Sequence, residues 1–182
     1  MQDFMTMLRE RSSTRNFTGE PVDRECIGLL LEAALLSPSS RNLKPWEIIA
    51  VEDPMLLTAM SAVKAHGSSF LAHAPLGIVV LGNPELSDVW IEDTSIVSVL
   101  IHLAAESLGL GSCWIQIRGR MDGTGASSAG RVKDILRVPP PWEPESIIAV
   151  GHAGKLDAAS EEKMRPGRIN AQLKEKIHWN GY

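Results

Sequence analysis

The sequence has few cysteines and no long apolar run, and each shortage excludes a class of protein. Its 182 residues include only two cysteines, Cys26 and Cys113, which lie far apart in apolar segments. A disulfide framework or a zinc cage needs more cysteines at closer spacing, so we expect neither. The longest apolar run, Ile96–Ala105, is interrupted by Ser98 and His102 and is shorter than the roughly 18 residues of a membrane span. We therefore expect no association with a membrane.

An excess of basic residues is also missing. Lys and Arg together number 18 against 22 Asp and Glu, which gives a net charge of −4. This balance does not favour binding to nucleic acid or to an anionic membrane. The first residues, Met1-Gln2-Asp3-Phe4, have neither the basic start nor the apolar core of a secretory signal, so we expect a cytoplasmic protein. Hydrophobic residues make up 44%, enough for one core, so we expect a single domain over 1–182 with a polar C-terminal arm at 155–182.

Common catalytic signatures are missing as well. The sequence has no Gly-Lys-Ser/Thr phosphate loop and no Gly-x-Ser-x-Gly nucleophile elbow. The segment Gly123–Ser128 has serine where the third glycine of a dinucleotide-binding fingerprint belongs. The five histidines show no metal-ligand spacing. We therefore expect no metal site, and we assign no protein side chain as a catalytic acid, base or nucleophile.

Apolar spacing predicts helices that alternate with short strands. The expected helices are at about 2–10, 23–37, 53–65, 92–108 and 131–137. The expected strands are at 46–51, 76–81, 112–117 and 146–150. This alternation by itself suggests a parallel α/β fold, although α+β folds show the same order. The 92–108 helix is apolar nearly all round, which predicts a central position or a subunit interface.

Three polar or glycine-rich stretches are candidate binding segments. In Arg9–Phe17, arginines and serines surround a helix end and could bind a phosphate or a carbonyl-rich ring, although they also fit a solvated turn. Leu36–Glu47 places polar turn residues before a Pro-Trp pair. Leu108–Arg118 has glycines that allow another surface to approach closely. It also contains Cys113, which we expect to be a small buried residue and not a nucleophile.

Together these stretches resemble the nitroreductase family of flavin mononucleotide (FMN) enzymes, in particular its short single-domain members. The matching motifs are Arg11-Ser12-Ser13-x-Arg15-x-Phe17, Ser37-Pro38-Ser39-Ser40-x-Asn42-x-x-Pro45-Trp46 and Ala105-Glu106-x-Leu108-Gly109-Leu110-Gly111-Ser112-Cys113-Trp114-Ile115. The resemblance covers nearly the whole chain. It implies an α+β fold with a central, mostly antiparallel sheet flanked by helices, in place of a parallel one. It also implies an intertwined homodimer with exchanged C-terminal arms and a flavin at each side of the interface.

The resemblance also implies a set of cofactor-binding residues. Phosphate and the pyrimidine edge of the flavin would be held by Arg11, Ser12, Ser13 and Arg15. The partner subunit would add Pro38, Ser39, Ser40 and Asn42. The chain would pass the flavin at Gln116, Ile117 and Arg118, and the C-terminal phosphate ligands would be Arg165 and Arg168.

The activity implied by this resemblance is electron transfer through bound FMN. NADH or NADPH would reduce the flavin, and a nitroaromatic, a quinone or a similar electron-poor small molecule would then take the electrons in a ping-pong sequence. Two alternatives stay open. One is a flavin-binding or sensing module without substantial turnover, and the other is a specialised branch of the family that dehalogenates substrates or destroys flavin. The sequence names neither the acceptor nor the preferred nicotinamide.

Overall fold

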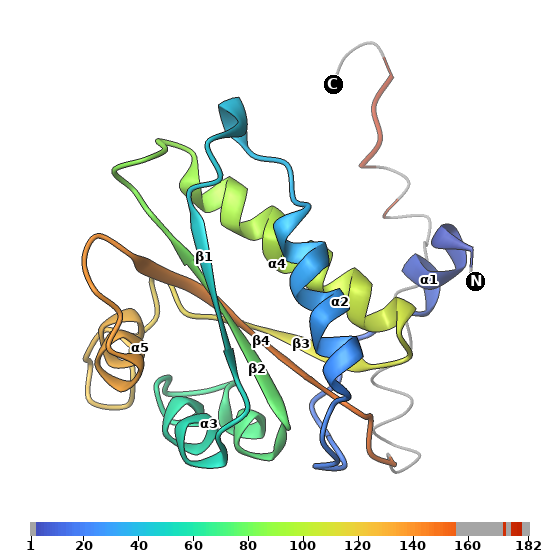
Figure 1. The fold of residues 1–182 in the computed structure, drawn as a ribbon, viewed down its shortest axis with the longest axis horizontal. Helices are drawn as coiled ribbons and strands as arrows, with labels where there is room; N and C mark the ends of the chain where they lie inside the picture. The colour runs from blue at the N-terminus through green and yellow to red at the C-terminus, as the bar shows by residue number, and fades with distance from the viewer. Residues whose placement is uncertain (1–2, 156–172, 174–175, 180–182) are drawn as a thin grey trace.

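The computed structural model of the protein describes residues 3–155, 173 and 176–179. Within them, four strands form one sheet in the order β1-β2-β4-β3 (Figure 1). The strands are β1 (Trp46–Val51), β2 (Leu76–Gly82), β3 (Gly111–Gln116) and β4 (Glu143–Gly151). Every neighbouring pair is antiparallel. The parallel arrangement suggested by the alternation of elements is therefore wrong, and the antiparallel α+β sheet implied by the resemblance is confirmed.

The connections between strands explain this direction. Val51, the last residue of β1, pairs with Gly77 in β2, so the chain between them returns at the same end of the sheet. That connection contains α3 (Pro54–Ser61) and the 3-10 turn η2 (Ser69–His73), which lie beyond one end of β1 (Figure 1). A parallel pair would need a crossover that runs back along the sheet. The order of elements alone does not distinguish these two kinds of connection.

Local signals place most of the helices. Besides α3 and η2, the chain forms the helices α1 (Phe4–Glu10), α2 (Arg24–Leu35), α4 (Trp90–Ser107) and α5 (Ser128–Leu136), with the 3-10 turn η1 (Ser40–Asn42). Helix α3 begins after Asp53, close to the expected start, and Asp53 caps it because its Oδ1 accepts the Met55 N–H at 2.7 Å. By contrast, α5 begins at Ser128, earlier than the expected residue 131, because the Ser127 side chain caps it by accepting the Gly130 N–H.

Two apolar layers, one on each face of the sheet, form the core. Val79 and Leu81 belong to the layer beneath α3 and α5, whereas Ile78 and Val80 belong to the layer beneath α2 and α4. All seven residues of β2 are buried, as in a strand that is covered on both faces. A one-residue shift in pairing would exchange these faces, so the two layers also determine the register of the sheet.

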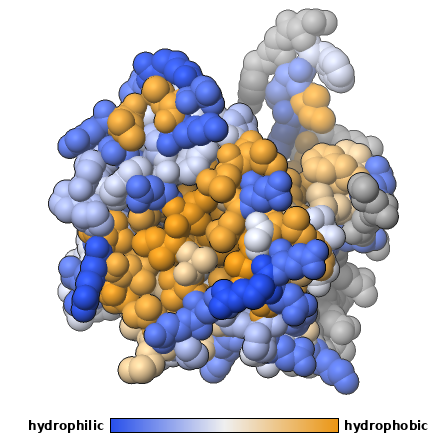
Figure 2. Space-filling view, in the orientation of Figure 1, coloured by the Kyte–Doolittle hydropathy of each residue, from blue (hydrophilic) through white to orange (hydrophobic). Residues whose placement is uncertain are grey.

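The helical layer of α2 and α4 leaves apolar side chains in contact with solvent. Helix α4 packs Val97, Ile101 and Ala105 against the sheet, but Ile96 and Val99 are 39% and 47% exposed. Figure 2 shows hydrophobic residues gathered over this face of the molecule. A contiguous exposed patch of this kind is typical of a protein interface. Among the described residues, no helix is both long enough and apolar enough to span a membrane.

Candidate functional site

The arginine–serine segment lies extended between the start of β3 and the end of β4. The Thr14 N–H donates to the Ser112 carbonyl at 2.9 Å, and the Thr18 N–H donates to the His152 carbonyl at 3.0 Å. The Asn16 carbonyl accepts the Gly154 N–H at 2.8 Å. These backbone bonds join three segments that are far apart in the sequence: 14–18, the start of β3 and the residues that follow β4. The segment is therefore held rigidly against the sheet, as a binding site requires.

Two glycines, Gly111 at the start of β3 and Gly151 at the end of β4, leave room for other parts of the chain to pack closely. A Cβ atom added at Gly111 would lie 2.6 Å from Thr14 Oγ1, and one added at Gly151 would lie 2.5 Å from Pro75 Cδ. Real Cβ atoms do not approach other atoms so closely. The close approach that we expected at Leu108–Arg118 is therefore present. Gly111 is required there, because a larger residue would prevent the arginine–serine segment from packing on β3.

Basic side chains gather around the buried sulfur of Cys113. The Ser13 side chain and the positive charges of Arg15, Lys64 and Arg11 lie close enough to this thiol to favour its ionised form. Burial raises the pKa of the Cys113 thiol despite these positive charges. Cys113 is only 1% exposed, so the expectation of a small buried residue is confirmed.

Among the residues that the structure describes, no ion pair involves the cationic cluster of Arg11, Arg15, Lys64 and Arg120. Burial and then the positive charge of Arg120 lower the pKa of Lys64, so the basic groups repel one another. The four ion pairs within the described part of the chain involve other cations, namely Arg24, Arg41, Arg131 and Lys133. Hydroxyl groups of Ser12 and Ser13 lie on the same segment and are half-buried. Such a donor set fits an anionic, carbonyl-rich group.

Sequence reasoning missed Lys64 and Arg120. Lys64 follows α3, and Arg120 lies in the loop after β3, so neither is near the arginine–serine motif in the sequence. The tertiary contact that brings them together is the hydrogen bond from the Ala65 N–H to the Met121 carbonyl at 3.1 Å. No local signal in the sequence indicates that contact.

His102 joins the start of β3 to α4. Its Nδ1 and the Ser112 hydroxyl form a hydrogen bond, and Ser112 is itself 3% exposed. Burial, together with the nearby positive charge of Arg11, lowers the pKa of His102 to about 4. The imidazole is therefore neutral at pH 7 and acts as an uncharged hydrogen-bonding group beneath the site.

The other end of β3 contains a hydrogen-bond network centred on Gln116. The Trp114 indole N–H donates to Gln116 Oε1 at 3.0 Å, and Gln116 Nε2 donates to the Arg118 carbonyl at 3.2 Å and to Glu145 Oε1 at 3.2 Å. Glu145 is 2% exposed, and burial raises the pKa of its carboxyl group. The Gln116 amide is thus engaged within the protein and orients the turn that follows it.

Ile117 and Arg118 take different positions in that turn. Their N–H groups both donate to the Glu145 carbonyl at 3.0 Å. The Ile117 side chain is fully buried in the core, whereas Arg118 is exposed. Of the residues expected at this end of β3, Arg118 is therefore the one whose charged side chain is free to reach a ligand. The C-terminal residues expected to bind phosphate, Arg165 and Arg168, lie outside the described residues.

A single chain does not bring the 37–45 loop to the arginine–serine segment. The Ser40 N–H donates at 2.8 Å to Asp93, near the start of α4, whereas Arg11 acts electrostatically on His102 and Glu106, near its end. At a rise of about 1.5 Å per residue, these contacts are about 13–20 Å apart along α4. Figure 1 shows α1 and the turn after α2 at opposite ends of α4. Pro38, Ser39, Ser40 and Asn42 are thus separated from Arg11, Ser12, Ser13 and Arg15.

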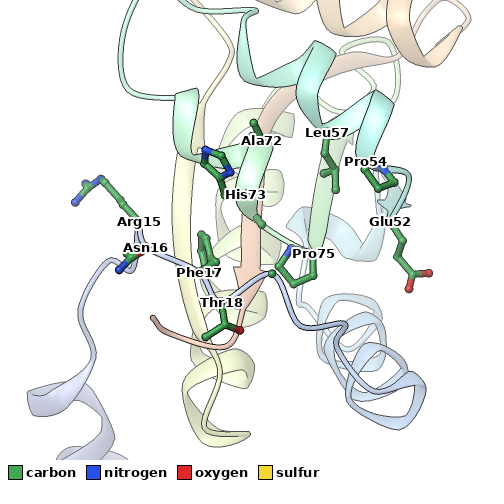
Figure 3. Close-up of a pocket in the computed structure, with 12 residues that line it drawn as sticks. Arg15, Asn16, Phe17, Thr18, Glu52, Pro54, Leu57, Ala72, His73 and Pro75 are labelled. Carbon is green, nitrogen blue, oxygen red and sulfur yellow. The ribbon is translucent and has the colours of Figure 1, made fainter. Parts of the chain in front are cut away.

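A pocket of about 510 Å³ adjoins the cationic cluster. Arg15 and Asn16 lie at one end of it, and Glu52 and Pro54 lie at the other (Figure 3). His73 contributes a further polar group from η2. Arg15 belongs both to the lining of this pocket and to the cationic cluster, so the segment that carries Arg15 borders both.

The chain matches known proteins over nearly its whole length. The model of the Nitroreductase family matches residues 8–66 and 58–152. An FMN-dependent nitroreductase from Clostridium difficile R20291 has a solved structure that is 36% identical, with a TM-score of 0.89, covering 98% of this chain and 99% of that one. A solved structure from Parabacteroides distasonis, provisionally named an NADH dehydrogenase/NAD(P)H nitroreductase, is 30% identical, with a TM-score of 0.86 and full coverage of both chains.

A curated relative gives the same result. A protein from Archaeoglobus fulgidus, provisionally named an NADH dehydrogenase/NAD(P)H nitroreductase, is 30% identical over 178 residues, which cover 94% of this chain and 99% of that one. Family model, sequence and fold agree with the arginine–serine segment that packs against β3 and the end of β4. The chain belongs to the nitroreductase family.

Proposed function

We propose that this protein is an FMN-dependent oxidoreductase that takes electrons from NADH or NADPH and passes them to small electron-poor acceptors. The observation that carries the proposal is the cationic cluster, whose members take part in none of the ion pairs within the described residues. The Clostridium difficile neighbour is an FMN-dependent nitroreductase by name, and the Archaeoglobus fulgidus relative is named for NAD(P)H. Both names agree with a site that attracts an anionic, carbonyl-rich cofactor.

The residues present fit FMN. Arg11, Ser12 and Ser13 would bind the phosphate through charge-assisted hydrogen bonds, and Arg15 with Lys64 would place positive charge at the pyrimidine carbonyls. When bound, FMN supplies the reversible two-electron chemistry. The protein binds and orients FMN. The neutral His102 and the buried Cys113 would lie beneath it and would transfer no protons. No side chain is assigned as a general acid or base.

The second half of each site would come from another copy of the chain. The 37–45 loop and the arginine–serine segment lie at opposite ends of α4, so one chain does not supply both to one ligand. In a homodimer packed through the apolar face of α4, Pro38, Ser39, Ser40 and Asn42 of the partner subunit would complete the site. The exposed Ile96 and Val99 support such packing, since an interface would bury them.

The C-terminal arm would add to this dimer. Strand β1 is at an edge of the sheet, and beside it lies a groove of about 470 Å³ lined by Leu31, Leu35, Trp46 and Ile48, among others. In the arm, Ile177 and Trp179 are 62% and 85% exposed. Apolar side chains with this exposure are expected to bury against a partner surface, and an edge strand is a natural one. We therefore propose that the arm of each subunit packs on the other.

Nitroaromatics and quinones are the acceptors that we propose. Both are planar and electron-poor, so they can occupy the place that the nicotinamide leaves. One cofactor-centred site then serves donor and acceptor in turn.

Anaerobic reduction of the purified protein tests the activity. We expect a yellow protein that releases FMN, identified by mass, and loses its visible absorbance on addition of NADH or NADPH. Reoxidation by a quinone or a nitroaromatic should restore the absorbance. Bound FMN that neither nicotinamide reduces would overturn the proposed oxidoreductase in favour of a flavin-binding module. A protein that binds no FMN would refute both.

A further inference from the structure

We propose that Asp93 is a positioning residue for the flavin site of the partner subunit, because it fixes the 37–45 loop that its own chain contributes there. The inference rests on the proposed function. It assigns a role to a buried carboxyl group on α4 that lies outside the cationic cluster and has no counterpart among the expected site residues.

Asp93 is placed to hold the loop from within the protein. The side chain is 2% exposed, although it lies in the first turn of α4. Its Oδ1 accepts the Ser40 N–H at 2.8 Å, and its Oδ2 accepts the Ser87 hydroxyl at 3.2 Å. Ser87 is also 2% exposed, so this second contact is shielded from water. Both carboxyl oxygens are therefore engaged, and one of them determines the position of the loop backbone.

The loop needs such an anchor because its backbone is strained. Arg41, Asn42 and Lys44 have φ values of 53°, 55° and 48°, in the left-handed region that side chains other than glycine rarely adopt. Conformations of this kind persist only where surrounding contacts over-determine them, and they gather at binding sites. Three such residues close together indicate a loop that is held in a particular shape.

The other side-chain contacts of the loop are more exposed. Ser39 Oγ accepts the Lys44 N–H at 2.9 Å within the loop itself. The ion pair between Arg41 and Asp88 lies in water, with side chains 63% and 78% exposed, and exposed pairs of this kind contribute little. The bond from Ser40 to Asp93 connects the loop to the core of its own subunit.

The surroundings of the loop indicate that its shape serves a second copy of the chain. Leu43 in the loop, Leu36 just before it and Leu86 in the segment between β2 and α4 are 42%, 73% and 52% exposed, as expected for residues that a partner covers. The loop also lies about 13–20 Å along α4 from the contacts of Arg11, so it does not reach its own cationic cluster. Asp93 thus acts across the proposed interface.

The first test compares variants of the homodimer. Asp93→Ala removes the acceptor for the Ser40 N–H and should raise the Kd for FMN about tenfold. Asp93→Asn keeps an acceptor oxygen and can donate to Ser87, so its Kd should stay within about threefold of the parent value. Glu92→Ala is the matched control, because Glu92 is the exposed neighbour in the same helical turn. Unchanged FMN binding by Asp93→Ala would overturn the inference.

A mixed dimer then tests the direction of the effect. One subunit carries Asp93→Ala, and the other, with a different affinity tag, carries Arg15→Ala. If Asp93 serves the partner's site, both defects fall in one site, and the second site is intact. We expect the mixed dimer to bind one FMN per dimer with parental affinity, although each variant homodimer binds weakly. A purely structural role, or a role within its own subunit, leaves no intact site and would contradict the inference.

Two further measurements keep the outcomes distinct. The parent protein must bind two FMN per dimer, because failure at that step refutes the proposed function itself. If the Asp93→Ala chain does not fold, Asp93→Ser replaces it in both experiments. Its side chain keeps a polar group in the first turn of α4 but is too short to accept from Ser40. Restoration of one site in the mixed dimer supports the inference with either variant, and its failure overturns it.

Discussion

The Thr14 N–H donates to the Ser112 carbonyl at 2.9 Å, and this bond joins the arginine–serine segment to the start of β3. Ser13 and Ser112 form a parallel bridge at the same place, and Gly111 leaves room for the Thr14 side chain. The same Ser112 bonds to His102 through its hydroxyl group. One residue of β3 therefore connects the N-terminal motif to α4.

Replacement of Arg15 should weaken FMN binding without unfolding the protein. Arg15 is exposed within the cationic cluster, so Arg15→Ala should lower the binding free energy by about 1.5–3 kcal/mol, the usual contribution of a hydrogen bond to a charged group. Fluorescence titration with FMN measures this loss. Arg9→Ala, also exposed but outside the motif, should change the affinity little. Equal losses in the two variants would show that the motif is assigned in the wrong register.

A methyl group at position 111 should disturb the packing of the arginine–serine segment against β3. The new Cβ of Gly111→Ala would lie 2.6 Å from Thr14 Oγ1, so either the segment or β3 must move. We expect a loss of about 1–3 kcal/mol in the free energy of unfolding, the usual range for overpacking, together with weaker FMN binding. Gly123→Ala is the control, because no atom lies within 4 Å of its added Cβ. A Gly111→Ala protein as stable as the control would contradict the close approach.

The neutral imidazole of His102 should make the fold sensitive to acid. Its pKa in the folded protein is about 4, below the ordinary value of 6.5, so the unfolded chain binds more protons between these pH values. Stability should therefore fall as the pH drops from 6.5 to 4, by roughly 2 kcal/mol from this residue.

His102→Asn isolates that effect. Asparagine can still bond to the Ser112 hydroxyl but does not titrate, so denaturant unfolding at pH 7.5 and pH 4.5 should show a smaller acid loss in the variant. Other titrating groups, including Glu145, are the same in both proteins and cancel in the comparison. An equal acid loss in both would rule out His102 as its source.

Removal of the C-terminal arm should disrupt the dimer. A chain truncated after Lys155 loses Ile177 and Trp179, which are exposed in the single chain, and should release FMN and become less soluble. Sedimentation and the visible absorbance report these two changes. Trp179→Ser should show the same changes to a smaller degree. A truncated protein that stays dimeric and yellow would refute arm exchange.

The kinetics of turnover should be ping-pong if donor and acceptor occupy one site in turn. Double-reciprocal plots against NADH or NADPH, at several fixed concentrations of a quinone, should then be parallel. High concentrations of the acceptor should inhibit competitively against the nicotinamide. Lines that converge would instead require a second binding site and would contradict the shared one.

The sequence by itself determined where most elements begin and end, and which residues form the core. The signals involved are local. Asp53 and Pro54 start a helix through contacts within one turn, and the unbroken apolar run of β2 indicates a strand buried on both faces. The two motifs around Arg15 and Gly111 could also be recognised from the sequence, because each occupies a short stretch of chain.

Tertiary structure alone decided how these pieces combine. The antiparallel order of the strands depends on the path of the connections, and the helix–strand order does not encode it. Lys64 and Arg120 join the cationic cluster, and Glu145 orients Gln116, only because sheet register and loop contacts bring distant residues together. The separation of Ser40 from Arg11 along α4 is likewise a property of packing. A motif records residue types and spacing, whereas the distance between two motifs depends on every element packed between them.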